Sequence, residues 1–446
     1  MALVFFWLLL ALMALGVPIV FALVMAPVFG ILIQDKLVFL SMLPQRIFSG
    51  INQFPLLAIP MFILAGEVMN HGGITLRLVT FAKTLVGHFR GGLAQVNILS
   101  SMLFAGLSGS AVADTSALGS MLIPAMEQNG YTRRFAAAIT AASSVIGTII
   151  PPSGIMILYA FIMNVSVAGL FAAGIVPGLL IGFGLMLMTW LLAKRYKFPV
   201  ASEKATWRQR GTALRVAFWP LLTPIILLGG ILTGVFTPTE AAAVAAGYAL
   251  VVTLFVTRTL TVKDLPEVFY TTALSAGTIL LLVAAAVSFS SVISLFQTPQ
   301  VLIGFVLWMA DNPYSLLFAV NIMLFIVGMF LDAGPAILIL GPILGPAMTS
   351  MGIDPMHFAI VMCVNVTVGL ATPPMGLVLF VAAGISGERV ERIAWAMMPF
   401  LLVEIAVIFL ITYVPEVSLT LPRLLGFASW PDCAIDPLNA LTCLFM

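Results

Sequence analysis

The chain has 446 residues, of which 62% are hydrophobic and only 8% are charged, and its formal net charge is +2. Soluble domains carry about a quarter charged residues, so this composition excludes a soluble globular protein, and the near-neutral balance gives no indication of nucleic-acid binding. Apolar runs near the roughly 20 residues that span a bilayer as helix recur throughout, which places the protein in lipid.

Ten apolar stretches are predicted to cross the membrane as single helices. In chain order they cover residues 2–15, 17–33, 51–70, 135–165, 167–193, 217–236, 240–257, 270–296, 357–384 and 393–413. The first has neither a basic start nor a cleavage site before a soluble domain, so we interpret it as a membrane helix and not as a signal peptide. The prediction is an all-α polytopic membrane protein.

Two further apolar stretches, residues 92–126 and 314–348, are too long for one crossing and are broken in the middle. Ser108-Gly109-Ser110 interrupts the first, and Asp332-Ala333-Gly334-Pro335 interrupts the second. We predict that each stretch is a re-entrant helical hairpin. Unpaired backbone groups at a hairpin tip are tolerated only where protein or water surrounds them, so both tips should line a cavity.

An internal repeat relates the two hairpins. An offset of 222 positions, the difference between Gly106 and Gly328, aligns residues 106–160 with 328–382 without a gap. The paired prolines Pro151-Pro152 and Pro373-Pro374 match, so each copy contains a hairpin followed by a proline-broken helix. Five crossings and one hairpin make an odd-numbered unit, which predicts two inverted repeats.

Positive charges test the orientation, because Lys and Arg concentrate in cytoplasmic loops. All but three of the 19 Lys and Arg residues fall on the predicted inner side, many of them in a basic loop at 194–216; the exceptions are Lys36, Arg46 and Arg423. Both termini are then predicted to be periplasmic. Two cysteines of the tail, Cys433 and Cys443, could pair in an oxidising exterior or remain thiols.

The segments at 71–91 and 298–313 precede the two hairpins in equivalent positions and are predicted to be amphipathic arms along the membrane surfaces. Such an arm could brace a moving part within a static frame, or it could be a polar connector. The residues leave both alternatives open.

Motifs for enzymatic chemistry are missing from the sequence. It contains no H-E-x-x-H, no phosphate-binding loop, no G-x-S-x-G and no Cys/His cluster, and His71, His88 and His357 are scattered. The prediction is therefore that the protein is not an enzyme. If the protein carries out any uphill transport, the energy must come from an ion gradient or a partner protein.

The paired broken helices suit ion capture. Pro151-Pro152 removes two backbone donors and frees carbonyl groups of the preceding turn, and Pro373-Pro374 does the same in the second copy. Hydroxyl and amide groups precede the breaks, including Ser144 and Asn365. Neutral oxygen ligands of this kind favour weak, reversible binding of a hard cation such as Na⁺.

Acidic residues near the hairpin tips have two interpretations. An ionisable side chain such as Asp114 within a membrane helix marks a functional site by default, and the alternative is that it caps the first turn of its half-helix. The same alternatives apply to Asp332, which aligns with Ser110 in the repeat. Glu240, in Thr237-Pro238-Thr239-Glu240, is predicted to cap a helix.

These residues together resemble the large membrane subunit of the tripartite ATP-independent periplasmic (TRAP) transporters. The resemblance spans residues 1 to about 425 and lies in the segments at 54–67, 109–115, 151–153, 236–242 and 372–374. It implies a Na⁺-driven importer of a small organic anion, a carboxylate or a sugar acid, that works by an elevator motion in the bacterial inner membrane. Its partners would be a small four-helix membrane subunit and a periplasmic substrate-binding protein. The tail from Gly426 departs from the family pattern.

The resemblance also implies site residues, with Na⁺ as the coupling ion and no organic cofactor. The first Na⁺ site would comprise Ser108, Gly109, Ser110, Ser144, Thr148 and Pro151. The second would comprise Asp332, Ala333, Gly334, Asn365, Gly369 and Thr372. Substrate would lie between the tips, against Ser110, Asp114, Ser153, Gly334, Pro374 and Met375.

In the implied domain division, a static scaffold surrounds a mobile transport domain. The scaffold would comprise residues 1–70 and 217–297, and the transport domain residues 92–193 and 314–415, leaving 416–446 as a periplasmic tail. A self-sufficient ion-coupled carboxylate carrier without a binding protein is the alternative within the transporter class. An intramembrane enzyme is the alternative outside it, and it lacks the paired acids and nucleophile that it would need.

Overall fold

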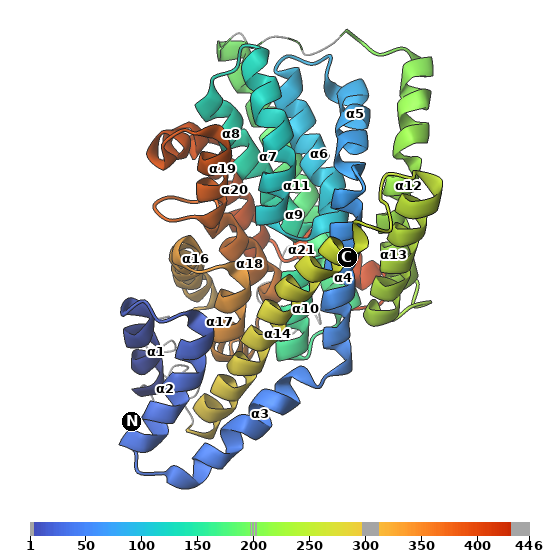
Figure 1. The fold of residues 1–446 in the computed structure, drawn as a ribbon. Helices are drawn as coiled ribbons and strands as arrows, with labels where there is room; N and C mark the ends of the chain where they lie inside the picture. The colour runs from blue at the N-terminus through green and yellow to red at the C-terminus, as the bar shows by residue number, and fades with distance from the viewer. Residues whose placement is uncertain (1–3, 197, 199, 201–202, 297–311, 430–446) are drawn as a thin grey trace.

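The computed structural model describes residues 4–196, 198, 200, 203–296 and 312–429, without the side chains of Leu107 and Ser108. Within these ranges the chain is helical, and its extended structure is limited to one isolated bridge between Arg90 and Val200. The helices form one elongated bundle, from which α1 and α2 project at one end (Figure 1). The prediction of an all-α protein is confirmed.

The first half of the chain contains eleven α-helices and two short 3₁₀ helices among the described residues. They are α1 (Val4–Ala14), α2 (Ile19–Ile33), η1 (Leu37–Ser41), α3 (Met42–Ile51), η2 (Phe54–Leu57), α4 (Ala58–His71), α5 (Ile74–Val86), α6 (Gly92–Ser108), α7 (Ala111–Gln128), α8 (Arg133–Ser144), α9 (Ile146–Ile149), α10 (Gly154–Met163) and α11 (Val167–Tyr196).

The second half repeats much of this order. Its described elements are α12 (Trp207–Leu232), α13 (Pro238–Val251), the π-helix η3 (Val252–Val256), α14 (Leu265–Leu295), α16 (Pro313–Phe330), α17 (Ala333–Ser350), α18 (Pro355–Gly369), α19 (Leu377–Ser386), α20 (Val390–Tyr413) and α21 (Glu416–Leu424). The predicted cap at Glu240 is confirmed, because Thr237 and Glu240 form a reciprocal capping box at the start of α13.

Eight helices in the described part of the chain are long and apolar enough to cross a membrane, and a ninth span arises if the pair α8–α9 and α10, bent by 41°, counts as one. Six of the eight match predicted crossings, and the other two are α16 and α17 of the second hairpin. The predicted crossings at 2–15 and 17–33 correspond to shorter helices of 11 and 15 residues. The inverted relation of the two halves stays a prediction.

Two helices and one boundary differ from the sequence-based expectation. The amphipathic helix α3 was not predicted, and neither was α21, which lies in the expected tail and packs against α11. The predicted loop at 194–216 is shorter, because α12 already begins at Trp207. Helix α5 occupies the first predicted arm, whereas residues 297–311 of the second arm, and Cys433 and Cys443, lie outside the described residues.

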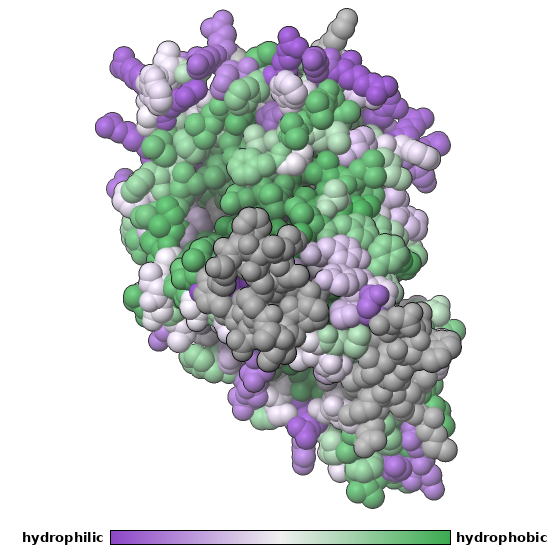
Figure 2. Space-filling view, turned by 180° about the vertical axis from the view of Figure 1, so that it is seen from behind, coloured by the Kyte–Doolittle hydropathy of each residue, from purple (hydrophilic) through white to green (hydrophobic). Residues whose placement is uncertain are grey.

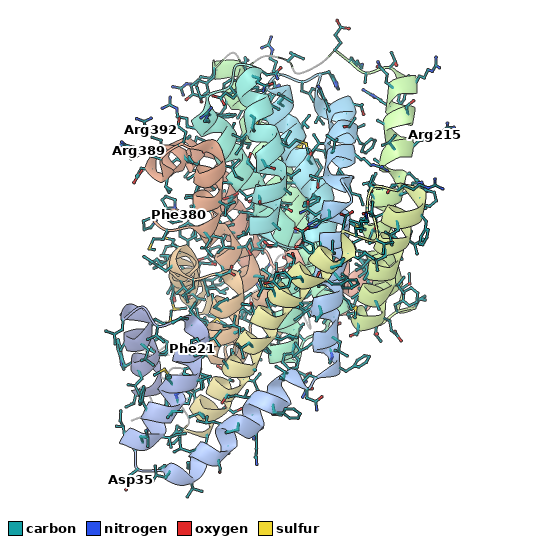
Figure 3. All side chains as sticks on the ribbon, in the orientation of Figure 1. Phe21, Asp35, Arg215, Phe380, Arg389 and Arg392 are labelled. Carbon is teal, nitrogen blue, oxygen red and sulfur yellow. The ribbon has the colours of Figure 1, made fainter. Side chains whose placement is uncertain are left out.

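Charged side chains collect at the two ends of the bundle. Figure 2 shows hydrophilic residues along one rim above a broad hydrophobic band. In Figure 3, Arg389, Arg392 and Arg215 lie toward one end, and Asp35 lies at the other. This separation agrees with the predicted charge distribution, while the assignment of each end to a membrane side stays a prediction.

The broken helices lie at the centre of the core. Every residue of α18 from Met356 to Gly369 is buried, and so is every residue of α8 from Phe135 to Ser144. Helices α6 and α7 pack on α8, and α16 and α17 pack on α18, so each pair of hairpin helices encloses one broken helix. The hairpins therefore cover the two broken helices, except at Pro374 and Met375 of the second break, which are exposed.

Candidate functional site at the hairpin tips

The first hairpin turns at Gly109 and Ser110. Gly109 has φ of +59°, a left-handed conformation that favours glycine, and a Cβ there would lie 2.9 Å from the Pro152 carbonyl oxygen. The Ser110 hydroxyl caps α7 by accepting a hydrogen bond from the Ala113 amide at 3.3 Å. The first tip therefore lies directly against the first helix break.

The first break is held by Ser153. Its hydroxyl donates to the Thr148 carbonyl at 2.5 Å and accepts from the Met156 amide at 3.4 Å, which caps α10. Thr148 in turn donates its own hydroxyl to the Val145 carbonyl at 3.0 Å. Ser153 is fully buried, so it fixes the two half-helices and does not face the cavity described below.

Asp114 lies behind the first tip. Its side chain is fully buried, and a Cβ on Gly147 would overlap the carboxylate. Ser110 is the N-cap of α7, and Asp114 lies in the first turn of the same helix, so both interpretations of Asp114 stay open. Asp114 therefore lies beside the backbone of Gly147, the residue that precedes Thr148 at the first break.

The second hairpin turns at Leu331 and Asp332. The Asp332 carboxylate accepts a hydrogen bond from the Ala333 amide at 2.7 Å and caps α17. At the second break, the carbonyls of Gly369, Leu370 and Thr372 accept hydrogen bonds from Thr372, Val378 and Gly376. A carbonyl oxygen has two lone pairs, so each of these can still face a cation.

Both tips and both breaks meet at one cavity of about 620 Å³, called here the central cavity. Tip one contributes Gly109 to Val112, and tip two contributes Asp332 to Pro335. The breaks contribute Thr148, Pro152 and Leu370. Asp332 is the one charged residue among the described residues that line it, and the remaining walls are largely apolar.

Several predicted site residues do not line the central cavity. Pro374 and Met375 are exposed, and Pro374 lines a separate hollow of about 430 Å³ together with Glu391 and Trp395. Ser144 and Asn365 are buried in α8 and α18. Ser108 ends α6, and its side chain lies outside the described part of the structure.

Buried polar networks join each hairpin to its broken helix, and the sequence analysis missed most of their members. In the first half, Asn97 of α6 donates to Thr140 of α8 at 2.6 Å, and Ser143 donates to Asn97 at 3.2 Å. In the second half, Asn365 of α18 donates to Asn321 of α16, which donates to Thr412 of α20 at 3.0 Å. The signal for these networks in the sequence is a series of polar residues at successive turns of an otherwise apolar helix.

His357 belongs to the same polar layer. Its two ring nitrogens lie 2.9 Å from the Ser418 hydroxyl and 3.2 Å from the Thr412 carbonyl oxygen. The buried imidazole therefore joins α18 to α20 and α21.

The apolar helices, and the cavity where two hairpin tips meet two broken helices, define a multi-span membrane transport protein. A solved structure with this architecture is the YdaH transporter of Alcanivorax borkumensis, which is 17% identical and has a TM-score of 0.56, with 89% of this chain and 90% of that chain covered. At this identity the likeness shows a shared fold alone.

The chain belongs to the tripartite ATP-independent periplasmic transporters, DctM component, whose family model matches residues 6–417. It is 39% identical to the C4-dicarboxylate TRAP transporter large permease protein DctM of Rhodobacter capsulatus over 95% of this chain and 99% of that protein. It is 38% identical to the sialic acid TRAP transporter large permease protein SiaM of Vibrio cholerae, again over 95% of this chain and 99% of that protein. The predicted family and the absence of an enzymatic role are confirmed.

Proposed function

We propose that this large permease imports a small organic anion, a C4-dicarboxylate or a sugar acid, and couples its uptake to Na⁺. The observation that carries the proposal is the central cavity, because it brings both tips and both breaks together around one acid. The relatives named for C4-dicarboxylate and sialic acid support the substrate class. The protein would act in the bacterial inner membrane, with both termini in the periplasm.

The first Na⁺ site would lie between tip one and the first break. Gly109 touches the Pro152 carbonyl, Thr148 lies in the cavity wall, and the buried Asp114 packs against Gly147. Backbone and hydroxyl oxygens with one nearby carboxylate suit a hard monovalent cation. Asp114 would thus serve the ion and not the substrate.

The second Na⁺ site would lie at tip two. Asp332 faces the central cavity from the start of α17, and Leu370 of the second break lies in the same wall. Asn365 and Thr372, which lie on either side of Leu370 in the sequence, are buried. The Thr372 hydroxyl donates a hydrogen bond to the Val368 carbonyl at 2.8 Å. These oxygens would surround the ion together with the Asp332 carboxylate.

Electrostatics would couple the two solutes. An organic anion entering a largely apolar cavity beside Asp332 meets a like charge at close range, which is unfavourable in a medium of low dielectric constant. Bound Na⁺ neutralises the Asp332 carboxylate and removes this repulsion, so the anion binds well only after the cation. The coupling would then be a consequence of one acid at the tip.

The transport cycle would be an elevator motion of the hairpins and broken helices against the scaffold. The central cavity has walls from both parts, because α2, α4 and α14 face the two tips. A small four-helix membrane subunit and a periplasmic substrate-binding protein would complete the transporter, and the family description of a tripartite periplasmic transporter supports this. The binding protein would deliver the anion to the open cavity.

Uptake in proteoliposomes tests the proposal. The chain and its small subunit are reconstituted with an inward Na⁺ gradient, and uptake of labelled succinate and sialic acid is measured with and without binding protein. We expect uptake that needs both the gradient and the binding protein. Uptake at full rate without the binding protein would instead identify the self-sufficient carrier.

A substitution at the first tip provides the internal control. Ser110→Trp should abolish uptake, because the indole would fill the space between tip and break. Ser120→Trp, at an exposed position on the same helix, should retain it. Unchanged Na⁺ dependence in Ser110→Trp would contradict the assignment of this tip to the ion.

A further inference from the structure

A second chamber of about 420 Å³, called here the outer chamber, is lined by several of the helices that line the central cavity. Three helices line both spaces in succession: α14 with Leu282 and then Ala286 to Ser294, α10 with Leu158 and then Phe161, and α17 with Pro335 and then Leu338 and Pro342. At 1.5 Å per residue, the step from Leu282 to Ser290 is about 12 Å. The two chambers therefore lie one after the other along these three helices.

One wall of the outer chamber carries hydroxyl groups. Ser290, Ser291 and Ser294 follow one another at helical spacing on α14, so they lie on one face. The Ser291 hydroxyl donates to the Val287 carbonyl at 2.8 Å and keeps its lone pairs for another donor. The opposite wall, from α10 and α17, is apolar.

Arg46 supplies the charge. It lies on α3, which packs closely on α14: a Cβ on Gly50 would be 2.9 Å from the Val287 side chain. Arg46 precedes Gly50 by one helical turn and therefore faces the same helix, where it lines the outer chamber beside the serines. It is the one charged residue among the described residues of that lining.

The Arg46 guanidinium is available for a ligand. None of the ion pairs between residues that the structure describes involves Arg46, and the side chain is exposed. Its planar set of donors matches the two oxygens of a carboxylate. Helix α3 starts near the end of the molecule where Asp35 lies, away from Arg389 and Arg392 (Figures 1 and 3).

We propose that the outer chamber is a binding site for a small organic carboxylate, held by Arg46 and the α14 hydroxyls before it passes to the central cavity. The identity of the anion rests on the proposed function. The outer chamber attracts an anion, whereas the central cavity with Asp332 repels one until a cation is bound. Arg46 would therefore concentrate substrate at the entrance without holding it at the coupling site.

Cysteine labelling tests the charge of the chamber directly. Ser294→Cys is introduced with Cys433→Ser and Cys443→Ser, while the buried Cys363 is retained. Labelling rates are compared for a sulfonate-bearing and an ammonium-bearing methanethiosulfonate of similar size. We expect the anionic reagent to be favoured, and Arg46→Gln to lower the ratio of rates about fivefold, as expected for a unit charge several ångströms away in water. Arg46→Lys should preserve most of the ratio.

Substrate protection supplies the second measurement. Millimolar succinate should slow labelling of Ser294→Cys, and Arg46→Gln should remove this protection. Ser315→Cys on α16, an exposed position outside the chamber lining, is the control and should show neither effect. The proposal would be overturned if Arg46→Gln left the ratio of labelling rates unchanged, or if succinate did not slow the labelling of Ser294→Cys.

The outcomes separate this site from the proposed function, because labelling needs no ion gradient. If labelling shows the charge preference and succinate protection while uptake is independent of Na⁺, Na⁺ coupling is rejected and the outer site is retained. Na⁺-driven uptake without charge preference or protection would reject the outer site and keep the coupling. In uptake assays, Arg46→Gln should raise the half-saturating substrate concentration about fivefold with little change in maximal rate.

Discussion

Gly328 on α16 and Gly369 on α18 lie so close together that a side chain on either would strike the backbone of the other. A Cβ on Gly369 would be 2.6 Å from the Gly328 carbonyl carbon, and a Cβ on Gly328 would be 3.0 Å from the Gly369 Cα. Their repeat mates have other neighbours: a Cβ on Gly106 would meet Pro224, and one on Gly147 would meet Asp114. Equivalent glycines therefore make different contacts in the two halves of the chain.

Gly369→Ala should destabilise the fold. Neither backbone at this contact can move without separating α16 from α18, and overpacking of this kind costs about 1–3 kcal/mol. Thermal unfolding of the detergent-solubilised protein measures the loss. Gly384→Ala on α19, where a Cβ has nothing within 4 Å, is the matched control and should be neutral or stabilising. Equal melting temperatures for the two variants would contradict the close contact.

Asp332→Asn should weaken Na⁺ binding while leaving the fold intact. Asparagine keeps an oxygen that can accept the hydrogen bond from Ala333, but it lacks the charge that a cation would meet in the central cavity. Because affinity follows the charge of the ligand set, we expect the Na⁺ concentration for half-maximal uptake to rise about tenfold.

The control for Asp332 is Asp35→Asn, which removes an acid that lies at one end of the molecule (Figure 3) and does not line the central cavity. Initial rates of uptake are measured over a series of Na⁺ concentrations at constant ionic strength. A normal Na⁺ activation curve in Asp332→Asn would remove this acid from the ion site.

Much of the fold could be predicted because membrane helices are uniformly apolar and their breaks are marked by Gly, Ser and Pro. The tips at Gly109 and Asp332 lie where the sequence placed them. The amphipathic helices α3 and α21 could not be found this way, because a search for apolar runs passes over helices with one polar face. For this reason, the sequence identifies Arg46 of α3 only as a positive charge outside the predicted inner side.

The two proline breaks differ in their surroundings. The family resemblance implies substrate contacts at Pro374 and Met375, and this stays a prediction, although neither residue lines the central cavity. In the first break, Ser153 ties α10 to Thr148 through its hydroxyl. Met375 occupies the same position without a hydroxyl, and this part of the second break is exposed. Partners from distant segments decide such details, and a single sequence does not contain them.

The Asn321 amide is expected to matter through its buried partners. Asn321→Leu leaves Asn365 and Thr412 without their hydrogen-bond partner, and an unsatisfied buried polar group costs about 1–3 kcal/mol. The double variant Asn321→Leu/Asn365→Val removes both members of the pair and should recover part of the loss. Unfolding of single and double variants in detergent gives the coupling energy, and strictly additive losses would argue against a direct interaction.

Gly147→Ala tests the contact between the first break and Asp114. The new methyl group would overlap the buried carboxylate, so we expect a lower melting temperature and loss of Na⁺-driven uptake. Gly277→Ala on α14, where a Cβ has nothing within 4 Å, is the control for glycine replacement in a helix.

A rescue experiment then separates packing from ion binding at Asp114. Asp114→Ala/Gly147→Ala relieves the overlap and should restore much of the melting temperature, since the carboxylate that the methyl group strikes is gone. Uptake should nevertheless stay low, because the first break would lack its neighbouring negative charge. If the double variant regained Na⁺-driven uptake along with stability, Asp114 would be a packing residue, and the first ion site would have to consist of neutral oxygens alone.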